Sequence, residues 1–123
     1  MVDVVAAKQE ITDAIGAHGT WKMRLQTAAQ TGRLQGRAVD LARDDLCRFG
    51  QWLGGLPPEM AGTDTAREVK RLHREFHNLA GGVARQVEAG DTAGARATLE
   101  TGQLGECSTQ LARALTSWKM ALR

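Results

Sequence analysis

The sequence predicts an all-α fold, an antiparallel four-helix bundle with a short second helix. The chain is rich in Ala, Leu, Arg and Gln, and it contains two prolines and no tyrosine. No run of alternating apolar and polar residues bounded by turns indicates a strand. Segments rich in glycine and proline divide the chain into four helical stretches, and 123 residues suit one hydrophobic core. We therefore expect residues 1–123 to form a single domain.

The first helix is expected from about Asp3 to Gln30. Along it, residues suited to a buried face recur every three or four positions. They are Ala7, Ile11, Ala14, Ile15, His18, Trp21, Leu25 and Ala28. The glycine-containing residues 31–36 end this helix. The spacing leaves open whether Val4, Val5 and Ile11 face the core or a partner chain.

Capping residues and segments that contain glycine or proline predict the bounds of the other three helices. Asp44 is a plausible N-cap for the short second helix, which would carry Cys47 and end at Gly54-Gly55-Leu56-Pro57-Pro58. The third helix should begin after Asp64 and continue to Gly90, and the fourth should run from about Thr92 to Leu122. Gly81-Gly82 within the third helix indicates either a close approach by another element or simple tolerance of glycine.

The three histidines and one of the two cysteines predict a metal site. His73 and His77 are four residues apart, so a helix places both imidazoles on one face. His18 falls on the apolar face of the first helix. Cys47 would lie in the first turn of the second helix, where free N–H groups and the helix dipole favour a thiolate. Since side chains of facing helices meet in a bundle core, we expect His18, Cys47, His73 and His77 to bind one Zn²⁺.

Other residues are expected around these ligands. A carboxylate such as Asp44 or Glu75 could orient a histidine, and Trp21 and Trp52 are expected nearby, although tryptophans at such positions serve equally as core or interface anchors. Cys107 has no histidine near it in sequence and is expected to be a packing residue. Each of these observations also has a simpler explanation when it is taken alone. A single inward histidine can be an ordinary core residue, and the H-x-x-x-H spacing can occur by chance.

Two kinds of metalloenzyme fit less well. The zinc protease motif needs Glu directly after the first histidine, where this chain has Arg74. A fourth protein ligand would also fill the position that a catalytic zinc keeps for water. A haemerythrin-like di-iron site needs carboxylates and more histidines than the three present. We therefore expect no enzymatic activity.

Charge and hydropathy indicate the compartment and exclude some partners. The 16 basic and 14 acidic residues give a net charge of +2 and are mixed along the chain, so neither nucleic acid nor a membrane surface is an expected partner. No apolar run approaches the roughly 20 residues of a membrane span, and the first residues do not have the pattern of a signal peptide. Two cysteines are too few for a disulfide framework. The expected location is the cytoplasm.

Three motifs follow one another along the chain. They are A-H-x-x-W-K-x-x-L from Ala17, D-x-x-C-x-F-G-x-W-L from Asp44 and H-x-x-F-H-x-x-A from His73, with Gly90-Asp91 and Ala95 further on. Together they resemble the chemoreceptor zinc-binding domain of bacteria, over nearly the whole chain.

The resemblance implies a four-helix bundle, often homodimeric, that binds zinc through three histidines and one cysteine. Members of this family report zinc or oxidants to chemoreceptors or diguanylate cyclases, which makes chemotaxis or cyclic-di-GMP signalling the implied output. These 123 residues include neither a signalling coiled coil nor a cyclase domain, so we expect either a stand-alone protein or a domain of a larger one. A structural zinc site in a helical interaction module is the alternative function.

Overall fold

The computed structural model describes residues 3–123, and within that range it contains helices and connecting segments but no strand. The helices are α1 (Val4–Thr31), α2 (Ala38–Leu41), α3 (Arg48–Gly54), α4 (Pro58–Ala61), α5 (Asp64–Glu88), α6 (Thr92–Glu100) and α7 (Gln103–Ala121). The predicted all-α class is confirmed. The predicted domain range also included residues 1 and 2, which lie outside the described part.

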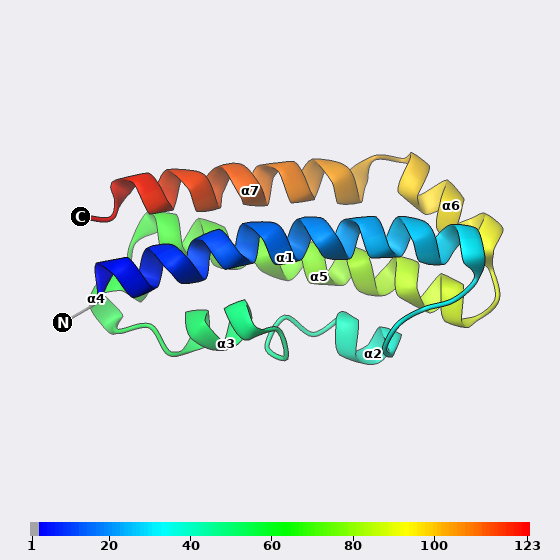
Figure 1. The fold of residues 1–123 in the computed structure, drawn as a ribbon, viewed down its shortest axis with the longest axis horizontal. Helices are drawn as coiled ribbons and strands as arrows, with labels where there is room; N and C mark the ends of the chain where they lie inside the picture. Colours follow the sequence, from blue (N-terminus) through cyan, green and yellow to red (C-terminus); the bar gives the residue numbers. More distant parts are fainter. Residues whose placement is uncertain (1–2) are drawn as a thin grey trace.

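Three long helices, α1, α5 and α7, lie side by side and form the body of the molecule (Figure 1). The helices α1 and α5 run in the same direction, and α7 runs back toward the N-terminal end of α1. Between α1 and α5 the chain returns along one side of this body through α2 and α3. This return segment, residues 38–54, is called the second pass below. It packs mainly on α5 through α2 and touches α1 through α3.

Local capping explains where the long helices begin and end. The side chains of Asp3 and Thr63 accept hydrogen bonds from the backbone of the first turns of α1 and α5, as N-caps do. Gly32 ends α1 with a φ of 76°, a left-handed conformation that glycine adopts without strain. The prediction of one continuous fourth helix is wrong. Gly102 has a φ of 81° and separates two helices, α6 and α7.

The start of the short helix α3 also differs from the prediction. We expected Asp44 to cap it and Cys47 to lie in its first turn, but α3 begins at Arg48 and Cys47 is the N-cap residue, with extended backbone at φ −71° and ψ 140°. The chain forms a turn before this point, where the Arg43 side chain donates two hydrogen bonds to Asp45, at 3.0 and 2.8 Å. Cys47 therefore lies on an irregular segment rather than on a helix.

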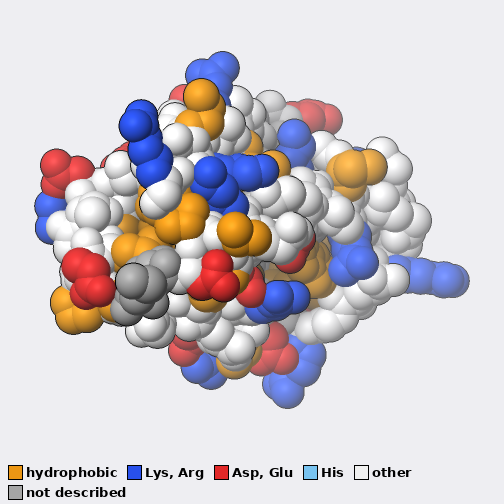
Figure 2. Space-filling model, turned by 60° about the vertical axis from the view of Figure 1, so that its left-hand side comes forward, with side chains coloured by type: hydrophobic (Ala, Val, Ile, Leu, Met, Phe, Trp, Pro, Cys, Tyr) orange, Lys and Arg blue, Asp and Glu red, His pale blue; other side chains and the backbone are white. Residues whose placement is uncertain are grey.

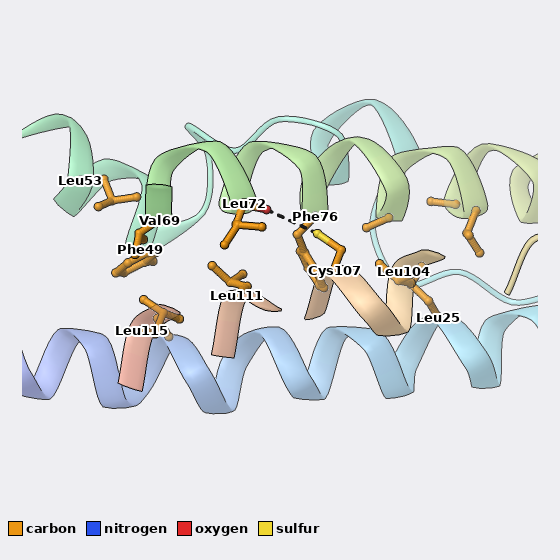
Figure 3. Close-up of a cluster of buried hydrophobic side chains, with 14 of the residues drawn as sticks. Leu25, Phe49, Leu53, Val69, Leu72, Phe76, Leu104, Cys107, Leu111 and Leu115 are labelled. Carbon is orange, nitrogen blue, oxygen red and sulfur yellow. Dashed lines mark hydrogen bonds between the residues drawn. The ribbon is translucent and has the colours of Figure 1, made fainter. Parts of the chain in front are cut away.

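The core lies between the three long helices, and Figure 3 shows the part of it between α5 and α7. Its largest fully buried side chains include Ile11, Leu25 and Phe76. Cys107 is buried there, with its Sγ 3.6 Å from the carbonyl oxygen of Leu72 (Figure 3), which agrees with its expected packing role. Ile11 belongs to the core, whereas Val5 is 80% exposed.

The surface carries charges of both signs. Figure 2 shows one face, on which lysine and arginine side chains alternate with acidic and hydrophobic ones. Over residues 3–123, no helix combines the length and the apolar character that crossing a membrane requires.

Candidate metal centre

Helix α5 provides two of the predicted ligands. Its inward face consists of apolar residues at helical spacing, and His73 and His77 belong to this face because they are separated by about one turn. The side chains are buried, with exposed fractions of 1% and 8%. Their Nε2 atoms are 3.2 Å apart. The sequence spacing thus places two nitrogen donors within reach of a single ion.

The third histidine comes from α1. His18 is 4% exposed, and its ring lies perpendicular to that of His73 with the centroids 4.8 Å apart. Phe76 packs edge-on against the same imidazole at 5.1 Å. The buried face of α1 therefore presents His18 to the histidine pair of α5.

Cys47 completes the cluster from the second pass. Its half-buried Sγ is 3.6 Å from Nε2 of His73 and 3.8 Å from Nε2 of His18. One donor atom from each of the four residues lies within 4.8 Å of all the others. The structure thus brings together all four residues that the sequence singled out, from α1, from α5 and from the segment before α3.

Backbone carbonyls determine the tautomer of two histidines. Nδ1 of His18 is 2.7 Å from the carbonyl oxygen of Ala14, and Nδ1 of His77 is 2.9 Å from that of Leu41. Since a carbonyl oxygen only accepts, Nδ1 of each neutral ring carries the hydrogen and donates it. Nε2 of both rings then presents its lone pair to the other residues of the cluster. Histidine ligands of metals are oriented in the same way, by a hydrogen bond from the other ring nitrogen.

Burial keeps these histidines neutral. It lowers the pKa of His18 to about 4, against the opposing effect of the hydrogen bond to Ala14. It lowers the pKa of His73 to about 3, with further contributions from His18 and His77. The pKa of His77 is lowered by burial too, although the Leu41 carbonyl and the charge of Asp44 oppose this. Neutral imidazole is the form that binds metal, so no proton has to leave these rings near pH 7.

Three of the six distances between donor atoms are close to those of a tetrahedral zinc site, and all six are within 4.8 Å. With Zn–N of about 2.05 Å and Zn–S of about 2.3 Å, tetrahedral geometry separates two nitrogens by about 3.3 Å and a nitrogen from sulfur by about 3.6 Å. The corresponding distances here are 3.2 Å between His73 and His77, and 3.6 and 3.8 Å from Cys47 to its two nearest nitrogens. Three imidazoles and one thiolate are also a donor set that zinc favours. The residues present therefore fit zinc.

The predicted surrounding residues take different positions. Trp21 lines a hollow together with His18, Cys47 and His77. Trp52 is separated from His73 by the ring of Phe49. It stacks on Phe49, whose ring centroid is 5.3 Å from that of His73.

The two carboxylates considered as orienting groups also differ in position. Asp44 is near enough for its charge to act on His77, but within residues 3–123 its carboxylate makes no hydrogen bond to a histidine of the cluster. Glu75 pairs with Arg71 on the exposed side of α5. Backbone carbonyls of Ala14 and Leu41, which have no signature in the sequence, orient the rings instead.

Gly50 shapes the second pass next to the cluster. A Cβ at this position would overlap the carbonyl oxygen of Asp44, lie 2.8 Å from its carbonyl carbon and stand 3.2 Å from Cε1 of His73. Only glycine lets the turn before Cys47 fold so tightly against α3. The sequence motif contained this glycine, but its role becomes visible only in three dimensions.

The comparison with known families agrees with this geometry. The family model described as the chemoreceptor zinc-binding domain matches residues 18–84, which is more than half of the chain and contains all four clustered residues. The chain belongs to the chemoreceptor zinc-binding domain family. The match begins at His18 in α1 and ends in α5, so α6 and α7 follow it. No curated protein and no solved structure matched this chemoreceptor zinc-binding domain.

Proposed function

We propose that this domain binds one Zn²⁺ through His18, Cys47, His73 and His77 and acts as a sensory module in signalling. The observation that supports this most is the convergence of four donor atoms, two of them imidazole nitrogens whose lone pairs are fixed by backbone carbonyls. The fold we propose for the module is an antiparallel four-helix bundle formed by residues 1–123, in which the second pass takes the place of the second helix.

The donor set favours a regulatory role over catalysis. Bound zinc would neutralise the Cys47 thiolate and connect α1, α5 and the second pass. Four protein donors leave no position for a reacting water, which catalytic zinc sites keep open. The protein's own residues thus hold and orient the ion, and we propose no enzymatic activity.

The decisive experiment is metal analysis combined with X-ray absorption at the zinc edge. Protein purified without added metal should contain about one zinc per chain, with one sulfur near 2.3 Å and three nitrogens near 2.0 Å. Cys47→Ala should lose the sulfur neighbour, while Cys107→Ala, a change at the other cysteine, should keep it. Folded protein that is metal-free and does not bind added zinc would contradict the proposal.

We further propose that Cys47 is the point at which the signal acts. A thiolate can be oxidised: hydrogen peroxide transfers one oxygen atom to the sulfur, leaving a sulfenate and one water molecule. Loss of zinc or this oxidation would loosen the second pass, so that it opens more often while it stays packed on α5 for most of the time. The change would reach a chemoreceptor or a diguanylate cyclase in the cytoplasm through a homodimer. Cys47→Ala should therefore abolish any response to oxidant. Sedimentation velocity at micromolar concentration tests the dimer directly.

A structural zinc site in an interaction module is the second candidate. The backbone hydrogen bonds of His18 and His77 favour it, because they orient two ligands firmly. In that case metal removal lowers the stability of the whole domain without releasing one segment. Hydrogen exchange, discussed below, distinguishes the two functions.

A further inference from the structure

A hollow of about 260 Å³ lies beside Cys47, between α1 and the start of α3. Three of the clustered residues, His18, Cys47 and His77, form part of its lining. A smaller hollow of about 170 Å³ reaches His73 on another side, but Cys47 is not part of its lining. A solute that approaches the sulfur from solvent therefore has a path through the larger hollow.

Charged side chains from two elements line the same hollow. Glu10 and Asp13 come from α1, and Arg48 is the first residue of α3, directly after Cys47. Arg48 donates a hydrogen bond of 2.7 Å to Glu10, so this ion pair joins α1 to the start of α3. The Glu10 side chain is 20% exposed and that of Arg48 is 77% exposed.

The charges at this hollow do not cancel. The guanidinium of Arg48 is paired with Glu10, which leaves the carboxylate of Asp13 as excess negative charge. Gln9 donates a hydrogen bond of 2.8 Å to Asp13. A net charge at the mouth of a cleft raises the local concentration of solutes of the opposite sign.

We propose that this hollow is the entrance through which small solutes reach Cys47, and that its excess carboxylate admits cations and neutral molecules in preference to anions. The inference rests on the proposed function in one respect, since the cation that the entrance would serve is Zn²⁺. Access to the thiol itself can be measured in metal-free protein.

The test uses full-length, metal-free Cys107→Ala protein, in which Cys47 is the only thiol. Its modification rate is measured with three methanethiosulfonates of similar size, bearing a trimethylammonium, an uncharged group or a sulfonate. In each case the thiolate attacks the thiosulfonate, displaces methanesulfinate and forms a mixed disulfide. Each rate is divided by the rate of the same reagent with free mercaptoethanol, because the charge of any thiolate already favours a cationic reagent. The normalised rate should be highest for the cationic reagent and lowest for the anionic one, and added salt should reduce the difference.

Substitutions at the entrance should change this order in opposite directions. Asp13→Asn should lower the ratio of cationic to anionic rate by about threefold, and Arg48→Gln should raise it, because each changes the charge beside the path by one unit. Local loosening would instead accelerate all three reagents together. Glu59→Gln is the matched control: Glu59 is exposed on α4 and lines neither hollow, so the ratio should stay unchanged.

The possible results separate the two proposals. The proposed entrance is wrong if the normalised rates are equal for the cationic and anionic reagents, or if Cys47 does not react in folded protein. It is also wrong if Asp13→Asn and Arg48→Gln change the ratio in the same direction. If the protein does not bind zinc but Cys47 still prefers the cationic reagent, only the proposed function is wrong. If both proposals hold, Asp13→Asn should also slow zinc association in stopped flow by about threefold, with the sulfur and nitrogen neighbours unchanged.

Discussion

At the scale of single residues, burial controls the state of the histidines. His18 and His73 are 4% and 1% exposed, their rings pack against Phe76 and Phe49, and within residues 3–123 no carboxylate hydrogen-bonds to either ring. Burial without an opposite charge penalises the imidazolium form. Metal-free protein therefore has three uncharged rings in contact, and any proton added to one of them destabilises the fold.

This burial predicts a loss of stability in mild acid. The pKa values of His18 and His73, about 4 and about 3, lie below the unfolded value of 6.5, so below pH 6.5 the unfolded chain binds protons that the folded one does not. The free energy of unfolding of metal-free protein should fall by up to about 1.4 kcal/mol per pH unit for each histidine as the pH decreases from 6.5 toward 4. Urea unfolding at a series of pH values measures this slope.

A variant provides the control for this pH dependence. His18→Gln removes one titrating ring, so its slope between pH 6.5 and 5 should be smaller by up to about 1.4 kcal/mol per pH unit. Stability that is constant from pH 7 to 5 in the unsubstituted protein would show that the rings are not buried as described.

Gly50 supports a second prediction at this scale. Gly50→Ala places a methyl group against the Asp44 carbonyl and near Cε1 of His73, so the turn that leads to Cys47 must move. Zinc affinity, measured by competition with a chelating dye, should fall by about 10- to 100-fold, the range known for changes just outside a ligand shell. Gly54→Ala in the same helix meets nothing within 4 Å, and its affinity should match that of the unsubstituted protein.

At the scale of elements, the second pass depends on α5 for its position. The N–H group of Ala38 donates a hydrogen bond of 2.9 Å to the Glu88 side chain at the C-terminal end of α5. One turn further along α2, the Leu41 carbonyl accepts from His77. Helices of four and seven residues are too short to be stable alone. The segment that carries Cys47 is thus held mainly by tertiary contacts.

The two adjacent glycines of α5, Gly81 and Gly82, support a prediction about how closely α2 packs on α5. A Cβ at Gly81 would stand 2.5 Å from Cβ of Ala42, at the end of α2, whereas a Cβ at Gly82 meets nothing within 4 Å. Gly81→Ala should lower the free energy of unfolding by about 1–3 kcal/mol, as overpacking does. Gly82→Ala should raise it by up to about 1 kcal/mol, because alanine favours the helix. Denaturant unfolding of the two variants compares them, and equal effects would exclude the close approach of α2.

Local signals made most elements predictable. The expected bounds of the first helix differ by one residue at each end from α1, because a side-chain cap and a left-handed glycine determine both ends within a few residues. The four clustered residues were also predictable, since histidine and cysteine on inward faces have few other roles. The contact of His77 with Leu41 joins residues 36 apart, and no local pattern signals it. The extended backbone at Cys47 could not be predicted for a similar reason. The turn that leads to it depends on the close approach of Gly50 to Asp44.

At the scale of the whole molecule, the three long helices share an apolar core that extends well beyond the cluster. Leu111 and Leu115 of α7 pack with Phe76 of α5 in one apolar core (Figure 3), and the ends of α1 and α5 are capped independently of any ligand. The second pass contributes fewer buried residues to this core, among them Phe49 and Leu53. Parts with few buried contacts open at lower free energy than the rest.

This difference predicts where the effect of metal removal appears. If zinc regulates the domain, chelation should accelerate hydrogen exchange in residues 38–54 by at least tenfold and leave the central turns of α1, α5 and α7 unchanged, because the long helices keep their own core. Cys47→Ala should reproduce the accelerated exchange without chelator, since it removes the donor of the second pass. Cys107→Ala is the matched cysteine control and should respond to chelator as the unsubstituted protein does. If the protection of all helices decreases together, by the same free energy as the global stability, the metal is a structural component of one cooperative unit and the regulatory proposal is wrong.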